Sequence, residues 1–429
     1  MPTRILVVGG GGREHALAWK LGSEPGVNEV VVAPGSDAIA LEPRVRREAI
    51  ELTDVGGLVD LARRRSIELA VIGPEISLAL GTADELVEAG VPTFGPTLAA
   101  ARIETSKGFC REVAVAAGVP MARGALFDRE SEAIDTARAF AVTDHQIVVK
   151  EDGLAGGKGV TVCGSLEEAE ATIVDLFEKT HGPIIVEERL EGVEASVIAL
   201  CDGVRAVALP AARDHKRLRD GDAGPNTGGM GAYTPLPDLT AADTESIVQR
   251  FHVPVLAELA RRGMPFRGAL YAGLMLTADG PRLLEFNARF GDPETQVMLP
   301  RLGSALGPLL LAAAQGKLPA DAPRLTTGRQ AAVGIVLASA GYPAPPSTGD
   351  RIDGLDAAEV AEAIVFHAAT RRADDGTWAT TGGRVLTVVG RGPDLEAARD
   401  RAERAADAIS WPGMQRRRDI GRAQQSVPA

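Results

Sequence analysis

Cysteine is scarce in this sequence of 429 residues, which holds only three, at Cys110, Cys163 and Cys201. No two of them form a Cys-x-x-Cys pair, and their wide spacing argues against both a zinc site and a disulfide framework. Reduced, buried cysteines are typical of cytoplasmic proteins. We therefore expect a cytoplasmic location.

Long hydrophobic runs and aromatic residues are also few. The first apolar run, at residues 5–9, is too short for a signal or membrane segment, and no later run could span a bilayer. Aromatic residues make up only 4%, so the cores must rely on aliphatic side chains. Acidic residues outnumber basic ones, and the formal net charge of −12 argues against binding to nucleic acid or to anionic membranes.

Alternating strand and helix patterns divide the chain into three domains. Residues 1–102 repeat a strand, a tight turn and a helix, which predicts a doubly wound α/β domain. Residues 103–327 form a second domain, in which residues 122–192 are predicted to be a smaller α+β lobe with a glycine-rich hairpin. Residues 328–422 form a last α/β domain, and residues 423–429 are a polar tail.

Glycines interrupt the first strand at residues 9–12, directly before a predicted helix. The pattern is not a dinucleotide fingerprint, because Glu14 stands where its third glycine belongs and no acidic residue ends the second strand. Free N–H groups at the start of a helix still favour a phosphate-sized anion. A tight turn that binds nothing explains this motif equally well.

A second glycine cluster lies between two predicted strands, at residues 150–160. Backbone N–H groups together with Lys150 and Lys158 would suit a triphosphate. The segment is not a P-loop, since Gly159 follows Lys158 where Ser or Thr would be needed. A flexible hairpin with a solvated lysine is the weaker alternative, because glycine is costly in strands unless something must come close.

The segment LLEFNARFGDPE, at residues 283–294, predicts a metal-binding strand. The period of two places Glu285, Asn287 and Arg289 on one face. Few hard oxygen ligands, completed by substrate phosphates, are what Mg²⁺ prefers. Arg289 could then neutralise a transferring phosphoryl group. The alternative is an edge strand whose Glu and Arg pair in solvent.

The polar stretch at residues 213–237 is predicted to be a long loop without regular structure. Loops of this length inside compact domains are usually functional. It carries Asp214, His215 and Lys216, and then Asn226 and Thr227 before three glycines. We expect it to shape a substrate site.

Several motifs together resemble one enzyme family. GGGGREHA covers residues 9–16, DGLAGGKGV 152–160, GPNTGGMGAY 224–233 and EFNARFGDPE 285–294. The last two motifs together are highly specific. On these motifs nearly the whole chain resembles the phosphoribosylamine–glycine ligases, or glycinamide ribonucleotide synthetases, of the ATP-grasp superfamily.

This resemblance implies an ATP-dependent ligase that joins glycine to 5-phosphoribosylamine through glycyl phosphate. The products would be glycinamide ribonucleotide, ADP and phosphate, in the second step of de novo purine biosynthesis. ATP and either Mg²⁺ or Mn²⁺ are the implied cofactors. The middle domain would be an ATP-grasp domain, with the N-terminal domain binding substrate. We expect a monomer or a dimer.

The resemblance also implies roles for individual residues. Glu285 and Asn287 would hold the metal, and the catalytic residues would be Arg289, Lys158 and Asp292. The lysines would reach the ATP phosphates, residues 187–190 would read adenine, and Glu194 would hold the ribose. The ATP-binding set is Lys107, Lys150, Gly156, Gly157, Lys158, Glu187, Glu188, Leu190 and Glu194. The substrate-binding set is Gly11, Gly12, Arg13, Glu14, Asp214, Lys216, Asn226, Thr227, Gly229, Gly291, Asp292 and Pro293.

Three other functions fit the sequence less well. Another ATP-grasp ligase fits GPNTGGMGAY less well. A nicotinamide oxidoreductase is disfavoured by Glu14 and by the missing acidic residue after the second strand. A non-catalytic nucleotide-binding protein would have no use for a complete metal-binding face from Glu285 to Arg289.

Overall fold

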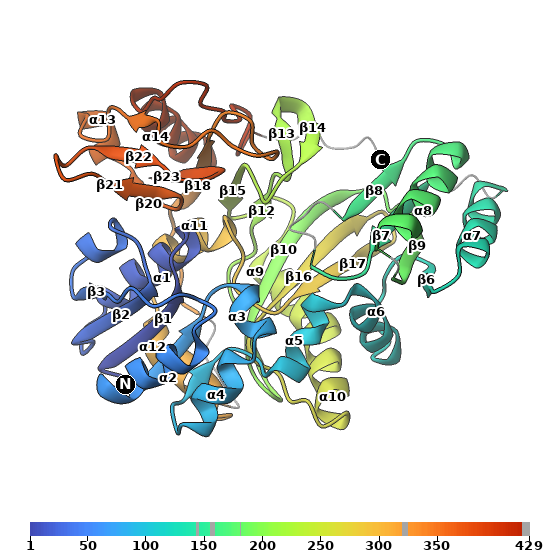
Figure 1. Cartoon of the computed structure of the whole chain (residues 1–429), viewed down its shortest axis with the longest axis horizontal. Helices are drawn as coiled ribbons and strands as arrows, with labels where there is room; N and C mark the ends of the chain where they lie inside the picture. The colour runs from blue at the N-terminus through green and yellow to red at the C-terminus, as the bar shows by residue number, and fades with distance from the viewer. Residues whose placement is uncertain (143–145, 155–158, 181, 320–324, 423–429) are drawn as a thin grey trace.

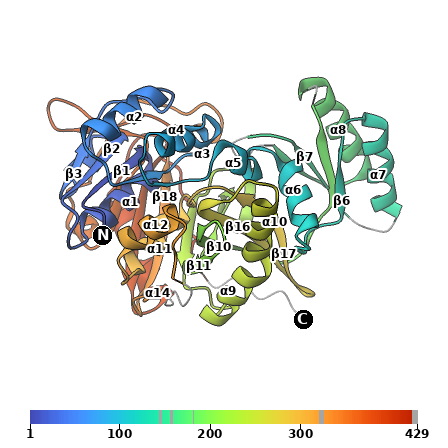
Figure 2. The ribbon, with the colours of Figure 1, turned by 90° about the horizontal axis from the view of Figure 1, so that it is seen from below.

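The computed structural model describes residues 1–142, 146–154, 159–180, 182–319 and 325–422. Figure 1 shows the N-terminal domain and a small lobe at opposite ends of the molecule, with the C-terminal domain above the N-terminal one. Figure 2 shows the same small lobe, which carries α7 and α8, standing apart from the rest. No helix in the described ranges is long and apolar enough to cross a membrane.

The N-terminal domain is a parallel five-stranded sheet in the order β3-β2-β1-β4-β5, as predicted for a doubly wound fold. The strand order reverses between β1 and β4, and ligands of such sheets bind beyond the carboxyl ends of the strands at this point. The strands are β1 (Arg4–Gly9), β2 (Glu29–Pro34), β3 (Val45–Arg47), β4 (Leu69–Ile72) and β5 (Thr93–Phe94). The helices are α1 (Gly12–Gly22), α2 (Val55–Arg64), α3 (Glu75–Ala79), α4 (Thr82–Glu88) and α5 (Leu98–Thr105), with a short turn η1 (Ile39–Leu41).

The small lobe is an α+β unit with its own core, formed by apolar side chains such as Ile147, Val149 and Ile173. Its antiparallel sheet has the order β6-β9-β7-β8. The predicted hairpin strands pair as β7 and β8, but Gly156, Gly157 and Lys158 lie outside the described residues. The elements are β6 (Gly124–Phe127), α7 (Glu130–Val142), β7 (Ile147–Glu151), β8 (Val160–Cys163), α8 (Leu166–Thr180) and β9 (Ile184–Glu188).

The rest of the middle domain is built on an antiparallel sheet in the order β11-β10-β16-β17. The first helix after β15 begins at Ala241, because Thr240 and Asp243 form a reciprocal capping box. The strands are β10 (Val193–Asp202), β11 (Ala206–Ala208), β16 (Arg267–Thr277) and β17 (Gly280–Asn287). The helices are α6 (Lys107–Ala116), α9 (Ala241–Ile247), α10 (Val253–Arg261), α11 (Glu294–Met298) and α12 (Leu306–Ala314), with the π-helix η3 (Val248–His252) and the short 3-10 helix η4 (Leu299–Arg301).

The strand predicted to bind a metal differs in one respect from the prediction. β17 ends at Asn287, so Arg289 lies in the bend beyond it and does not share a strand face with Glu285. The strand stops because the N–H of Ala288 donates to the carboxylate of Glu104, at 2.8 Å, instead of to a neighbouring strand.

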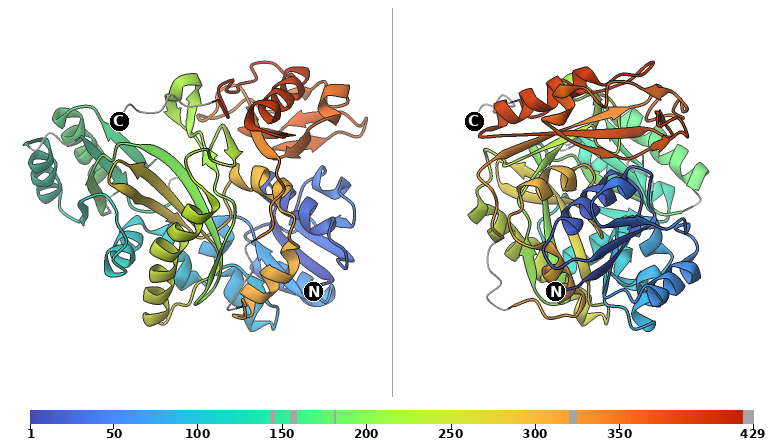
Figure 3. Two further views of the ribbon diagram at one scale, coloured as in Figure 1. Left: turned by 180° about the vertical axis from the view of Figure 1, so that it is seen from behind. Right: turned by 90° about the vertical axis from the view of Figure 1, so that its left-hand side faces the viewer.

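The C-terminal domain shares its main sheet with the middle domain. Its antiparallel order is β12-β15-β18-β23-β20, and β12 and β15 come from the stretch predicted to be an irregular loop. That stretch also forms the hairpin β13–β14, which projects between the C-terminal domain and the small lobe in Figure 3. The strands are β12 (Arg213–Asp214), β13 (Arg217–Arg219), β14 (Ala223–Asn226), β15 (Gly231–Thr234), β18 (Ala331–Ala338), β19 (Arg351–Ile352), β20 (Ile364–His367), β21 (Thr370–Arg372), β22 (Trp378–Thr380) and β23 (Arg384–Gly392). The helices are α13 (Ala358–Ala361) and α14 (Leu395–Ala408), with a turn η2 (Asp220–Asp222).

Candidate active site

The glycine turn after β1 holds a buried ion pair at the start of α1. Glu14 folds back and accepts a hydrogen bond from the Gly11 N–H at 2.8 Å, while its other oxygen accepts from Arg13 Nε at 2.5 Å. A Cβ atom at Gly9 or Gly73 would collide with the Glu14 side chain, so both positions require glycine. At the predicted anion site, the N–H group of Gly11 is therefore already bonded to Glu14 and is not free for a ligand.

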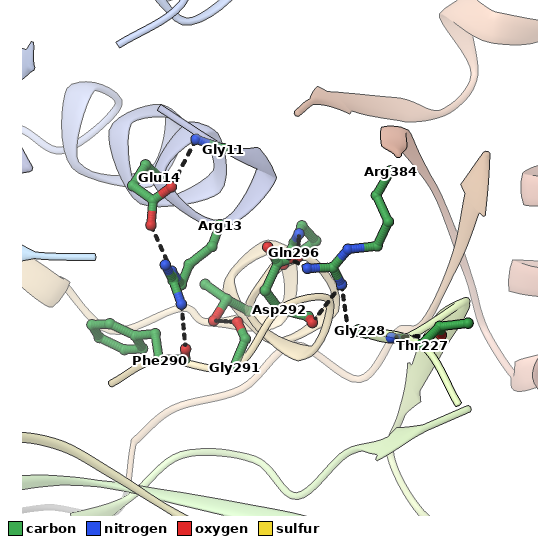
Figure 4. A network of polar contacts seen from close by, with 12 residues as sticks. Gly11, Arg13, Glu14, Thr227, Gly228, Phe290, Gly291, Asp292, Gln296 and Arg384 are labelled. Carbon is green, nitrogen blue, oxygen red and sulfur yellow. Dashed lines mark hydrogen bonds and ion pairs between the residues drawn. The ribbon is translucent and has the colours of Figure 1, made fainter. Parts of the chain in front are cut away.

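Arg13 reaches from α1 to the segment that precedes α11. Its Nη1 donates to the Phe290 carbonyl at 3.2 Å, as Figure 4 shows. The neighbouring Asp292 accepts from Gln296 Nε2 at 2.6 Å and pairs with Arg384 Nη2 at 3.1 Å. Burial alone would raise the pKa of Asp292, but Arg384 and Arg13 lower it below its ordinary value. Asp292 is therefore held ionised between two guanidinium groups.

Arg384 connects this ion-pair cluster to the segment between β14 and β15. Its Nη1 donates to the carbonyls of Gly228 at 2.5 Å and of Asp292 at 2.8 Å. The Thr227 hydroxyl donates to the Lys216 carbonyl at 2.8 Å and accepts from the Gly229 N–H at 3.0 Å. These contacts place residues of the middle and C-terminal domains next to the start of α1, as Figure 4 shows.

Arg289 forms the next part of the site. Its Nε lies 3.1 Å from a carboxylate oxygen of Glu104 and 3.3 Å from one of Glu75, and its Nη1 donates to the Phe290 carbonyl at 3.1 Å. Burial alone would lower the pKa of Arg289, but Glu104 and Glu75 raise it well above its ordinary value. A fixed positive charge is thereby maintained beyond the end of β17.

Asp214 and Lys216 have opposite electrostatic environments. Burial, together with Glu294, raises the pKa of Asp214 well above its ordinary value, and its Oδ1 has no hydrogen-bond partner among the described residues. Lys216 Nζ pairs with Glu194 at 2.9 Å. Burial opposes the charge of Lys216, but Glu194 and nearby acidic groups raise its pKa well above the ordinary value. Asp214 thus offers a polar atom to a ligand, and Lys216 offers a cation.

Three lysines act electrostatically on the carboxylate of Glu285. Burial alone would raise the pKa of Glu285, but Lys216, Lys150 and Lys107 lower it below its ordinary value. Lys107 Nζ donates to the Gly153 carbonyl at 2.7 Å, and Lys150 pairs with Glu187. Residues from α6, β7, β17 and the connection between β12 and β13 therefore contribute here, although they are far apart in the sequence.

The remaining residues predicted to bind nucleotide lie at or just after β9. Glu187 is buried and also pairs with Arg111 at 3.3 Å. Glu188 is buried and pairs with Arg123 Nε at 2.7 Å. Leu190 is half-buried in the segment between β9 and β10. This segment joins the small lobe to the sheet that carries Glu285.

Glu285 and Asn287 are suited to a divalent cation. The Asn287 amide nitrogen lies 3.5 Å from a Glu285 carboxylate oxygen, so the two side chains are neighbours at the end of β17. The described residues contain no cluster of three or more His, Cys, Asp or Glu side chains arranged for a metal. A carboxylate and an amide oxygen match Mg²⁺ or Mn²⁺ chemistry, in which phosphates and water complete the coordination.

Sequence reasoning missed several contributors to this site. Arg384 lies in no motif, and only the folded structure shows that it reaches Asp292. Gln296 follows the EFNARFGDPE motif by two residues, and its link to Asp292 is a contact four residues apart at the start of α11. Glu75 belongs to a Gly-Pro-Glu sequence directly after β4, and its position at the carboxyl end of a central strand was an available signal.

Family models match three consecutive parts of the chain. Residues 3–104 match the N domain of phosphoribosylglycinamide synthetase, residues 105–295 its ATP-grasp (A) domain, and residues 332–423 its C domain. The phosphoribosylamine–glycine ligase of Caulobacter vibrioides is 45% identical over 424 residues, which cover 97% of either chain. That of Allochromatium vinosum is 46% identical over 424 residues, covering 97% of this chain and 98% of the relative.

Solved structures agree with these sequence matches. The crystal structure of phosphoribosylamine–glycine ligase from Thermotoga maritima has a TM-score of 0.82 and 32% identity, covering 97% of this chain and 99% of that one. The biotin carboxylase domain of Hydrogenobacter thermophilus 2-oxoglutarate carboxylase, solved with MgADP and bicarbonate, has a TM-score of 0.71 at 18% identity. The match covers 97% of this chain and 92% of that one. The second match shows a shared fold only.

Proposed function

The chain belongs to the phosphoribosylglycinamide synthetase family, and we propose that the residues brought together above carry out its ligation reaction. The enzyme joins glycine to 5-phosphoribosylamine and uses ATP with Mg²⁺ or Mn²⁺. The reaction passes through glycyl phosphate to glycinamide ribonucleotide, ADP and phosphate, in the second step of de novo purine biosynthesis. The observation that carries our assignment is the pair of neighbouring side chains Glu285 and Asn287 at the end of β17, with Glu285 kept ionised by the charges of three lysines.

The chemistry explains why such a site is needed. The carboxylate of glycine is a poor electrophile toward an amine, and phosphorylation by ATP provides a good leaving group. Phosphoryl transfer is catalysed mainly by positioning and by electrostatic stabilisation. In our assignment Lys107, Lys150 and Lys158 bind the ATP phosphates, and the low pKa of Glu285 supports its ionised form as a ligand. The amine of phosphoribosylamine then displaces phosphate and forms the amide.

Glu285 and Asn287 would hold the divalent cation. Bound there, the cation would supply positive charge that stabilises the transferring phosphoryl group. The adenine side is assigned to the segment after β9, with Glu187, Glu188 and Leu190, and the ribose to Glu194. Gly156 and Gly157 would lie over the phosphates. Support comes from the position of this segment between the small lobe and the sheet of β17.

Arg289 and Asp292 are assigned to the acyl-transfer part of the site. The fixed charge of Arg289 would stabilise the glycyl phosphate, and the ionised Asp292 would orient the attacking amine. Gly11, Gly12, Arg13 and Glu14 would surround phosphoribosylamine from the N-terminal domain. The remaining substrate contacts would come from Asp214, Lys216, Asn226, Thr227, Gly229, Gly291 and Pro293.

We also propose the organisation of the whole protein. Its domains would be residues 1–102, 103–327 and 328–422, followed by a tail at 423–429. We propose a cytoplasmic monomer or dimer that binds neither nucleic acid nor membranes. The three buried cysteines and the acidic net charge support this proposal.

Glu285→Ala tests the metal assignment. We expect turnover to fall about a hundredfold or more, because a charge that anchors the metal and phosphates is lost. Glycine-dependent ADP formation measures turnover, and circular dichroism checks folding. Glu130→Ala, at the exposed start of α7, is the matched control and should retain normal activity. A folded Glu285→Ala variant with near-normal activity would overturn the assignment.

A further inference from the structure

A cavity of about 570 Å³ lies along β11, an edge strand of the middle-domain sheet. None of the residues lining it belongs to the site assigned above. Much of its wall is apolar and includes Ala206, Ala208, Leu236, Leu239 and Leu325. Its volume is in the range of small-molecule sites, which are typically apolar clefts with a few polar groups that fix orientation.

Arg301 is the buried charge on this wall, with a side chain held in place by two hydrogen bonds. Only 8% of the residue is exposed. Its Nε donates to the Gln330 carbonyl at 2.6 Å, and its Nη1 donates to the Thr234 hydroxyl at 2.7 Å. A guanidinium group has five N–H donors. The other three have no partner among the described residues, and no described carboxylate lies within 4 Å of Arg301.

The other buried arginines are all neutralised. Four arginines are buried in the described part of the chain, and three of them pair with carboxylates. Arg13 pairs with Glu14, Arg213 with Asp238, and Arg417 with Asp222. Burial of an unpaired charge is costly, and a guanidinium group does not escape the cost by losing its proton. Burial accordingly lowers the pKa of Arg301, with no acidic neighbour to offset it.

We propose that this cavity binds a small monocarboxylate with an apolar body, whose carboxylate pairs with Arg301. The planar guanidinium group matches a carboxylate through two parallel hydrogen bonds. The apolar wall receives the rest of the ligand. Glu245 also lines the cavity and disfavours ligands with two or more negative charges, such as inorganic phosphate.

The test uses 4-phenylbutyrate as the probe, with 4-phenylbutan-1-ol and 4-phenylbutylamine as its neutral and cationic counterparts. Isothermal titration calorimetry on the full chain should show saturable binding of the acid, about tenfold or more tighter than of the alcohol or amine. Arg301→Gln should weaken binding of the acid about tenfold. The matched control is Arg205→Gln, on the same wall, because Arg205 already lies 3.9 Å from Asp202. It should change affinity less than about twofold.

A second variant leaves Arg301 intact. Ala208→Leu adds bulk on the half-buried face of β11 and should abolish binding of 4-phenylbutyrate while the melting temperature of the free protein stays unchanged. Three results would each overturn the proposal. They are no binding at millimolar probe, equal affinity for the acid and the alcohol, and unchanged affinity in both the Arg301→Gln and Ala208→Leu variants.

Discussion

The Glu14 side chain occupies space that is left open by two glycines, Gly9 and Gly73. The Gly73 position at the end of β4 leaves room for its carboxylate, which in turn orients Arg13. We expect Gly73→Ala to displace Glu14 and to lower kcat/KM for phosphoribosylamine about tenfold or more, because small misplacements of binding groups are costly. Steady-state kinetics with the sugar amine generated in the assay would measure this.

Gly56→Ala provides the control for that substitution. It lies in α2, where a new methyl group meets nothing closer than Asp54 Oδ1 at 4.0 Å. It should leave kcat/KM unchanged. Unchanged kinetics in the Gly73→Ala variant as well would show that Glu14 does not position Arg13 for substrate.

His252 predicts a pH dependence of stability. It is fully buried, its Nε2–H donates to the Leu270 carbonyl at 3.1 Å, and its ring packs edge-on against Phe286. Burial lowers its pKa to about 4. The unfolded chain takes up a proton near pH 6.5, whereas the folded protein does so only near pH 4. The stability contributed by His252 is therefore present above pH 6.5 and is lost as the pH falls toward 4.

The expected loss from this residue is about 2 kcal/mol between pH 7 and pH 5. Urea unfolding of the wild type and of His252→Phe, at both pH values, isolates the effect of His252. The contributions of all other titrating groups are the same in the two proteins and cancel in the difference. The variant should lose about 2 kcal/mol less than the wild type over this interval. An identical pH dependence in the two proteins would rule out the neutral, buried histidine.

At the scale of elements, Arg417 ties the β13–β14 hairpin to the end of the C-terminal domain. It is fully buried and pairs with Asp222 and Asp419, each at 2.6 Å. Breaking a buried ion pair by removing one partner costs about 3 kcal/mol. We expect Arg417→Ala to destabilise the protein by about that amount and to raise KM for glycine or the sugar amine, since Asn226 ends the hairpin and Thr227 follows it.

Arg418→Ala is the comparison for Arg417→Ala. Its side chain is 58% exposed and pairs with Glu403 and Asp407 at the surface. Surface ion pairs contribute less than about 1 kcal/mol, so both stability and KM should change little. Equal effects of the two substitutions, measured by urea unfolding and steady-state kinetics, would show that the hairpin is not held by the buried arginine.

The same hairpin shows where prediction from sequence reaches its limit. β13 and β14 are short and polar, and they are stabilised by residues near 417–419, about 200 residues further along the chain. Local patterns cannot reveal such a contact. They do predict the strands β1, β4 and β17, whose apolar residues alternate or form short runs. Glycine follows β4 and ends β1, and the proposed metal ligands Glu285 and Asn287 lie at the end of β17. Arg289 was misplaced because Glu104, from a different element, ends β17 early.

At the scale of the whole molecule, the candidate site combines all three parts of the chain. Arg13 comes from the N-terminal domain, Asp292 from the middle domain and Arg384 from the C-terminal domain. The main C-terminal sheet also includes β12 and β15 from the middle domain. Motifs in the sequence located Arg13 and Asp292, but the contact with Arg384 depends on how the domains pack together.

The most direct test of this account is ADP formation from ATP and Mg²⁺, with glycine and phosphoribosylamine each omitted in turn. The account predicts ADP only when both substrates are present, because phosphoryl transfer to glycine and amide formation share one site. ADP formation that ignores glycine and follows a different carboxylic acid would contradict it.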